Sequence, residues 1–350
     1  SERYPSSTAS QRTYRLIPVV QLDKKFADSI LKTSFFYDLA FVHYEDANSV
    51  SSEQVKKVHQ FGNESAYLFG STRVGFGIRH VSYSKTVGTG ANDDFPSEQV
   101  LNLQASHSFN YTLSERSKLL FEPTLGGYAV TRKGFYPTGS VGLRREIALE
   151  NNGKYGEFFR LGFTKRFPSL LDRYYQFVQP AGPTTYVGYP NPGLKPENVR
   201  SIEMGADYAR GSYRNQITLF ARDYKHARYS RSFTVSSTVR GFQISNAGDA
   251  WVVGATESQD WKAHPMFDFG TRLTFQRSQI EDLNASFPYS PTWVGIVKAD
   301  IHDADNRYGL EISNKVASYF VAYSETEGNP RRLPGYYYLD LFARAEVYAG

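Results

Sequence analysis

The sequence predicts an all-β protein, a transmembrane antiparallel up-and-down β-barrel, and three observations carry this prediction. Apolar and polar residues alternate through most of the chain, whereas helical periodicity is almost absent. The strands that this alternation predicts are long, and short connections alternate with long ones. A chain of 350 residues can form either one large all-β unit or two ordinary domains.

The alternation predicts which side chains share a face of each strand, because a period of two residues places successive side chains on opposite faces. In three segments the apolar side chains share one face and the charged ones take the other: Ile202, Met204, Ala206 and Tyr208 against Glu203 and Asp207; Tyr337, Leu339, Leu341, Ala343, Ala345 and Val347 against Asp340, Arg344 and Glu346; Phe159, Leu161 and Phe163 against Arg160.

About fifteen strands are expected, and most meet or exceed the ~9–11 residues that a tilted strand needs to cross the hydrocarbon layer of a membrane. Their expected positions are 12–22, 30–45, 61–69, 72–84, 99–111, 118–131, 138–149, 156–167, 200–209, 214–225, 240–258, 264–279, 292–302, 307–320 and 336–348.

The connections between these strands differ at the two ends of the sheet, because every second connection of a meander lies at the same end. The short connections lie around residues 23–29, 70–72, 113–117, 150–155, 210–213, 259–263 and 303–306. The long ones are 46–60, 85–98, 168–199, 226–239, 280–291 and 321–335, with 132–137 the shortest of this set. Short periplasmic turns and longer extracellular loops are typical of outer-membrane barrels.

Closure of the sheet removes two hazardous edges and, in lipid, satisfies every backbone N–H and C=O group. Aromatic residues at strand ends suit the girdles of such a barrel: Tyr174, Tyr175, Tyr208, Tyr224, Tyr336 and Tyr337. The alternative is aromatic core packing in a soluble barrel, which the strand lengths disfavour.

The composition excludes several classes of function. The chain has no cysteine, so neither a disulfide framework nor a thiolate metal site is possible. The net charge of +5 is small for the length, and no Lys/Arg run of the nucleic-acid-binding type occurs, so no nucleic-acid partner is expected. The histidines are isolated, no HExxH or GxSxG motif exists, and Gly75 and Gly77 lack a third glycine and a following helix. We therefore expect no catalytic residues, no metal site and no cofactor.

Two phrases flank the longest loop. The first is Arg166-Phe167-Pro168-Ser169-Leu170 with Asp172 and Tyr174, and the second is Asn191-Pro192-Gly193-Leu194-Lys195-Pro196-Glu197, which leads into Ile202-Glu203-Met204-Gly205-Ala206-Asp207-Tyr208. Pro192 and Pro196 fix their own φ and bias the preceding residues to extended geometry, so the second phrase ends the loop stiffly and starts a strand in register.

These phrases resemble the signature of TonB-dependent outer-membrane receptors, in which a segment close to gFRAPSLSELY precedes a loop and NPDLKPE leads into a strand. Residues 242–258 and 333–347 and the YSPTW segment around Pro291 resemble further strands of that family. One departure is Glu257, which lies one place later than the usual glutamate. The resemblance covers residues 155–348, whereas 1–154 match only as a generic barrel.

The resemblance implies a barrel of about twenty-two strands around a plug domain. Residues 1–350 are accordingly expected to be one barrel domain without a plug, truncated at both ends, with its fifteen strands the sixth to the twentieth. The motif residues Phe167, Pro168, Ser169, Asn191, Pro192, Leu194, Lys195, Pro196, Glu197, Glu203 and Gly205 are expected to be structural.

The loop 168–199 is the expected ligand-binding segment, because aromatic rings offer rigid contact area and arginine offers a bidentate fork for carboxylate or phosphate groups. The candidate residues are Arg173, Tyr174, Tyr175, Phe177, Tyr186 and Tyr189. A structural role for these residues, within the loop or at the lipid headgroups, is the alternative.

The resemblance implies active import of a scarce nutrient of the iron-siderophore, haem or cobalamin class, with no bond-making chemistry. The implied partners are a small-molecule ligand, outer-membrane lipid and lipopolysaccharide, and the TonB complex, which an N-terminal region outside this chain would contact; the protein is expected to be a monomer. A passive porin or channel, a barrel enzyme and a soluble β-propeller or sandwich are the alternatives.

Overall fold

The computed structural model describes residues 9–46, 53–87, 93–94, 97–174, 177–181, 183–287, 290–305, 307–323 and 330–345. Nearly all of them belong to strands, which form one large sheet and two small ones. No helix in these ranges is long and apolar enough to cross a membrane.

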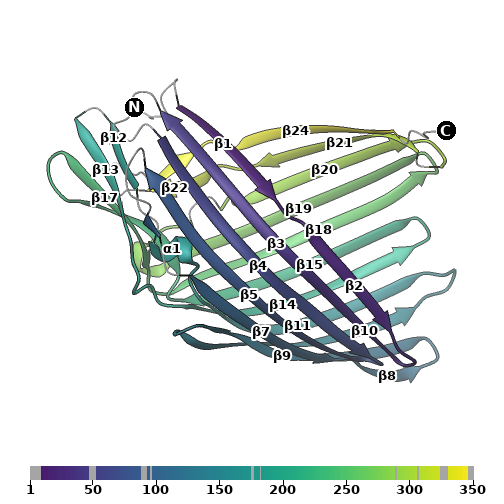
Figure 1. Ribbon diagram of the computed structural model, residues 1–350. Coiled ribbons are helices and arrows are strands. Elements are labelled where there is room, and N and C mark those ends of the chain that lie inside the picture. The colour runs from purple at the N-terminus through teal and green to yellow at the C-terminus, as the bar shows by residue number, and fades with distance from the viewer. Residues whose placement is uncertain are drawn as a thin grey trace, which may run out of the picture.

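The large sheet is an antiparallel meander (Figure 1). Its strands are β1 (Ala9–Leu16), β2 (Val19–Lys25), β3 (Ser29–Asp46), β4 (Glu53–Phe69), β5 (Thr72–Val87), β6 (Asp93–Asp94), β7 (Glu98–His107), β8 (Phe109–Ser114), β9 (Ser117–Val130), β10 (Gly134–Ala148), β11 (Lys154–Arg166), β14 (Glu197–Arg210), β15 (Tyr213–Lys225), β18 (Ala250–His264), β19 (Phe267–Ile280), β20 (Trp293–His302), β21 (Tyr308–Ala317) and β24 (Tyr336–Ala345).

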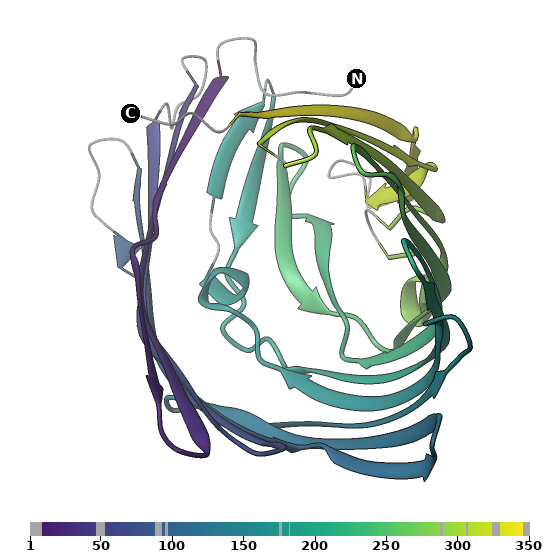
Figure 2. The ribbon, with the colours of Figure 1, turned by 90° about the vertical axis from the view of Figure 1, so that its right-hand side faces the viewer.

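These segments occupy fifteen positions in the sheet, which confirms the expected number. Strands β1 and β2 both pair with β3 and share one position, and β7 and β8 both pair with β9 and share another, with β6 a short addition to β5. The sheet curves around a central space, with β1 and β2 at one edge and β24 at the other (Figure 2).

The two ends of the sheet differ as the sequence predicts. At one end, which we call the turn end, successive strands are joined by tight connections such as Gly70–Ser71 and Gly211–Ser212. The opposite end, the loop end, carries additional elements (Figure 1). They are helix α1 (Leu170–Tyr174), the 3₁₀ turn η1 (Glu281–Leu283), a sheet of β12 (Phe177–Ala181), β13 (Thr184–Tyr189), β17 (Val239–Asn246) and β16 (Arg228–Thr234), and the pair β22 (Phe320–Tyr323) and β23 (Pro330–Leu333).

Several expected boundaries were wrong. Residues 53–60 and 134–137 were expected in connections but belong to β4 and β10. The strand expected over 240–258 is divided, because its first half is β17 of the loop sheet and only β18 belongs to the wall. The chain turns at Gly248, where an added Cβ would lie 2.3 Å from the exposed Asp282 carboxylate, which would have to move aside. The turn expected at 259–263 is part of β18 as well, since Trp261 continues the alternation between Tyr213 and Phe269 of the neighbouring strands.

The two faces of the wall differ in polarity. Helix α1 lies on the concave side (Figure 2), and Arg173 of α1 contacts Glu98, so the face that carries Glu98 is the inner, lumenal face. By strand register the same face holds several ion pairs: Arg15–Asp38, Arg144–Asp207, Arg222–Glu203, Lys298–Glu311 and Arg344–Asp300. The outer face exposes apolar side chains, such as Leu125 with 68% and Leu103 with 56% of their area accessible. This is the pattern of a wall that faces lipid outside and water inside.

Gly205 allows the wall to pack closely at β14. An added Cβ there would lie 2.1 Å from the Ile217 carbonyl oxygen and 2.7 Å from Cζ of Phe158, whose ring covers the glycine on the lumenal side. A ring over a cross-strand glycine fills the space that the missing side chain leaves. This contact explains why the motif needs a glycine at position 205.

Candidate ligand-binding site

The candidate site is built around α1, which begins directly after β11 at the loop end. Ser169 precedes the helix, and its backbone N–H and hydroxyl both donate to Oδ2 of Asp172, each at 2.9 Å. The backbone N–H of Asp172 donates to Oγ of Ser169 at 3.1 Å, so the two residues cap the helix reciprocally. Pro168 is fully buried beside them. The Phe-Pro-Ser phrase therefore starts and caps this single turn of helix.

Arg173 is held inside the protein. Only 1% of its area is exposed, and Nη2 lies 2.5 Å from Oε1 of Glu98 on β7. The guanidinium also lies 4.6 Å from the ring centroid of Phe167 and 5.3 Å from that of Tyr174, and its Nε donates to the Pro168 carbonyl. An arginine that is both ion-paired and stacked fixes α1 against the barrel wall.

Arg228 joins three parts of the loop end. Its Nη1 donates to Oδ2 of Asp172 at 2.5 Å and its Nη2 to Oε2 of Glu197 at 2.8 Å. Its backbone N–H donates to the other oxygen of Glu197 at 2.9 Å. Asp172 lies on α1, Glu197 begins β14 and Arg228 begins β16, so one guanidinium connects the helix, the wall and the loop sheet.

The Asn-Pro phrase is held by amide side chains. The backbone N–H of Asn191 donates to the Arg173 carbonyl at 2.7 Å, and its side chain donates to the carbonyl of Ile244 at 2.9 Å. Asn246 accepts from the backbone N–H of Lys195 at 2.8 Å and donates to the Lys195 carbonyl at 3.1 Å. Leu194 is buried between them. The prolines therefore rigidify a segment that α1 and the end of β17 hold in place.

A cavity of about 670 Å³ opens to the lumen beneath this assembly. Its wall includes Arg79 of β5, Asn102 of β7 and Arg166 of β11, together with Asp172 and Arg228. A second cavity of about 490 Å³ adjoins it, and both share Arg166, Asp172 and Arg228. Within the described ranges neither Arg79 nor Arg166 forms an ion pair. The lining also holds one carboxylate without an ion pair in these ranges, Glu64, so the two free guanidinium groups leave an excess of positive charge that could contact an anionic ligand.

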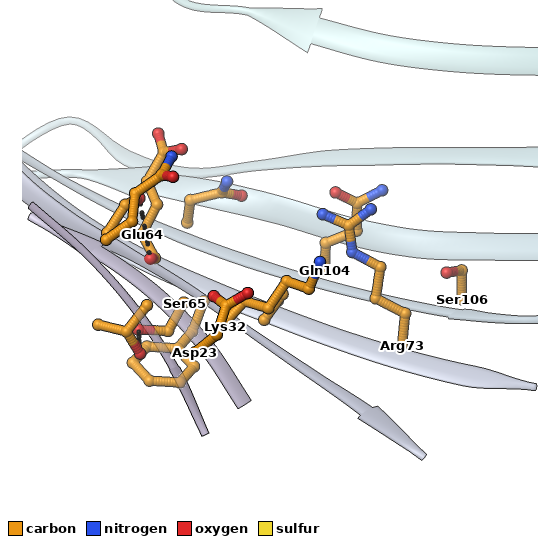
Figure 3. A pocket seen from close by; sticks show the side chains of 14 residues that line it. Asp23, Lys32, Glu64, Ser65, Arg73, Gln104 and Ser106 are labelled. Carbon is orange, nitrogen blue, oxygen red and sulfur yellow. Dashed lines mark hydrogen bonds between the residues drawn. The ribbon is translucent and has the colours of Figure 1, made fainter. Parts of the chain in front are cut away.

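A third cavity, of about 410 Å³, lies on the lumenal face near the turn end (Figure 3). Glu64, Arg73 and Ser106 rise from the same side of the sheet there, beside Asp23 and Lys32. The surface is polar and carries charges of both signs, as expected for a wall that faces water or another polar surface.

Comparison with known proteins identifies the family. The family model described as TonB dependent receptor-like, beta-barrel, matches residues 44–348. The chain belongs to the TonB-dependent receptor β-barrel family. It is therefore an outer-membrane protein, and its family is one of receptors and transporters rather than of enzymes. No curated protein matches the sequence significantly.

Solved structures show the same fold at low sequence identity. The chain is similar to the copper transporter OprC, with a TM-score of 0.66 and 13% identity over 99% of this chain and 60% of that one. The ferric enterobactin receptor PfeA matches with a TM-score of 0.68 and 14% identity over 97% and 55%. The siderophore receptor PirA from Acinetobacter baumannii matches with a TM-score of 0.65 and 10% identity, over 95% of this chain and 56% of that one. The chain thus spans somewhat more than half the length of these receptors.

The TonB-dependent receptor motifs meet at one place in space. Phe167, Pro168 and Ser169 start and cap α1, while Asn191, Leu194 and Glu197 hold the end of the same loop against it. Glu203 pairs with Arg222 on the lumenal face. The sequence suggested none of Glu98, Arg79 or Arg228 for this site, and Arg166 entered only as the first residue of the Phe-Pro-Ser phrase. Their spacing along the chain carries no local signal, since each comes from a different strand.

The residues proposed for ligand binding are distributed differently. Tyr186 and Tyr189 lie half-buried on β13, where their rings contact Phe242 and Phe233 at 5.9 and 5.6 Å between centroids. Tyr174 packs on Arg173, whose own side chain is enclosed. Tyr175 lies outside the described residues, as does the side chain of Phe177 at the start of β12. Of this set Tyr174, Tyr186 and Tyr189 keep part of their surface accessible.

Among the described residues, no group of three or more His, Asp and Glu side chains is placed to hold a metal ion.

Proposed function

We propose that the full-length protein imports an anionic metal chelate of the iron-siderophore class across the outer membrane, energised through TonB. The observation that supports this most directly is the pair of unneutralised arginines, Arg79 and Arg166, at the loop-end cavity. A ferric chelate with catecholate or hydroxamate-carboxylate groups often carries net negative charge, which such guanidinium groups attract. The named functions of the ferric enterobactin receptor and of the siderophore receptor with the same fold agree with this class of ligand.

In this proposal the chain supplies the barrel wall and the loops that face the outside. A plug domain elsewhere in the full-length protein would occupy the polar lumen and contact the TonB complex. Lipopolysaccharide would surround the loop end, and the protein would act as a monomer. The enclosed Arg173 would position α1, and the tyrosines of β13 would contact the ligand. Haem and cobalamin are the competing substrate classes.

Ligand binding is tested with the full-length protein and a panel of ferric siderophores, haemin, cyanocobalamin and Cu(II). Replacing Arg79 and Arg166 with Ala is expected to weaken binding of the preferred ferric chelate at least tenfold, since hydrogen bonds to charged groups are each worth about 1.5–3 kcal/mol. Arg214→Ala is the matched control, because Arg214 is a lumenal arginine at the turn end, far from this cavity. Equal affinity of the double variant and the control would refute the anionic-ligand site.

The uptake step separates active import from a passive channel. Deleting residues 176–190 is expected to abolish uptake while the barrel remains heat-modifiable on gels. Adding a protonophore is expected to stop uptake by the intact protein. Uptake that continues with a protonophore would favour a passive channel, and uptake that survives the deletion would remove the loop from the binding site.

A further inference from the structure

A carboxylate lies on the outer, lipid-facing side of the wall. Glu257 of β18 pairs in register with Ile217 of β15 and Leu273 of β19, and both of those apolar side chains are exposed on the outer face. A charged group on this face costs stability unless a partner compensates it.

The carboxylate is hydrogen-bonded but not neutralised. Nδ2 of Asn215 donates to Oε1 of Glu257 at 3.1 Å, and Nε2 of Gln259 donates to the same oxygen at 2.8 Å. Within the described part of the chain, no Lys, Arg or His forms an ion pair with Glu257. Both amides orient one oxygen, so Oε2 is left as an acceptor for a group from outside the chain.

The depth of Glu257, Asn215 and Gln259 in the membrane indicates which outside group can reach Oε2 of Glu257. Asn215 and Gln259 pair directly with each other, one layer of outward side chains from Tyr213 and Trp261. A layer corresponds to two residues of a tilted strand, or about 5 Å across the membrane. Trp261 and Tyr213 lie next to the turn end and match the aromatic girdle at the headgroup level. The amides and the carboxylate oxygen therefore lie about 5 Å inside the girdle, within reach of a lipid headgroup.

We propose that Glu257, Asn215 and Gln259 bind the primary ammonium of a phosphatidylethanolamine headgroup in the leaflet at the turn end. An –NH₃⁺ group brings three N–H donors and the positive charge that Glu257 lacks, and the neighbouring indole of Trp261 favours a cation. A choline headgroup carries the charge but no N–H, and a phosphoglycerol headgroup carries no cation at all. The site thus selects the primary amine among common phospholipids.

The test uses the full-length protein in nanodiscs of phosphatidylethanolamine and phosphatidylglycerol, and in matched discs in which phosphatidylcholine replaces the ethanolamine lipid. Native mass spectrometry is expected to show about tenfold stronger retention of phosphatidylethanolamine than of phosphatidylcholine, as one charge-assisted hydrogen bond allows. Glu257→Gln is expected to abolish this preference. Glu311→Gln is the control, because it removes a carboxylate that pairs with Lys298 on the lumenal face.

A thermal measurement distinguishes headgroup binding from a purely structural role. The wild type is expected to be more heat-resistant in the ethanolamine discs than in the choline discs, whereas Glu257→Gln should unfold at the same temperature in both. Equal retention of both lipids by the wild type, or a preference that Glu257→Gln keeps, would overturn the proposal. A cationic membrane protein that co-purifies with the wild type and is lost from Glu257→Gln would also overturn it.

Discussion

Replacing Arg228 with Met removes the guanidinium that joins α1, β14 and β16 while keeping an apolar chain of similar length. The Glu197 side chain is only 7% exposed, and it would keep one hydrogen bond, from the backbone N–H of residue 228, but lose its cation. Removing one partner of a buried ion pair costs about 3–5 kcal/mol. The side chains of Asp172 and Arg228 are 29% and 23% exposed, so solvent screens part of the loss and about 3 kcal/mol is expected.

This loss should appear as local opening of the loop end rather than as unfolding of the barrel. Hydrogen–deuterium exchange of peptides covering 170–174 and 228–234 is expected to accelerate roughly 100-fold in the full-length variant, the equivalent of about 3 kcal/mol. Adding Glu197→Gln should recover part of the protection, because the uncompensated charge is then gone. Unchanged exchange in these peptides would refute the reasoning. An equal acceleration in β15, which the Arg228 guanidinium does not contact, would refute it as well.

Two further predictions concern the wall. Gly205→Ala should sharply reduce the yield of heat-modifiable barrel, because its Cβ would lie 2.1 Å from the Ile217 carbonyl oxygen. The control Gly142→Ala, whose Cβ would have no atom nearer than 3.8 Å, should fold normally. Equal yields of the two variants would show that β14 and β15 can separate at little cost. By register, the outer face carries the side chains of Trp251, Trp261 and Trp293. Brominated lipids should therefore quench the tryptophan emission strongly, and aqueous acrylamide only weakly. The reverse order of quenching would show that the two faces are misassigned.

The wall of the barrel is predictable because its signal is local. Alternation places Met204 outside and Glu203 inside, and both assignments hold in the structure. The turn at Pro265–Met266 was expected at 259–263 instead, because the charged residues Asp260 and Lys262 are typical of turns when they are considered without their neighbours. Only the cross-strand partners of Trp261 on β15 and β19 show that the strand continues.

The site was much less predictable, because its contacts join residues far apart in the chain. The motif phrases locate the segment that folds around α1, yet nothing in them indicates that Arg173 pairs with Glu98 rather than with a ligand. Arginine and carboxylate side chains are common on every strand of a polar lumen. Which of them pair and which stay free depends on register and on the fold of the loops, so the sequence could not indicate that Arg79 and Arg166 lack ion pairs.

The parallel pairing of β13 with β17 has a consequence for ligand capture. These strands belong to two different connections, one between β11 and β14 and the other between β15 and β18, and five residues of each are paired. The two connections therefore move as one body, and much of their conformational freedom is already lost when the protein folds. A molecule that meets this surface need not order two separate segments, so less of its interaction energy is lost to entropy and a small contact can suffice for tight capture.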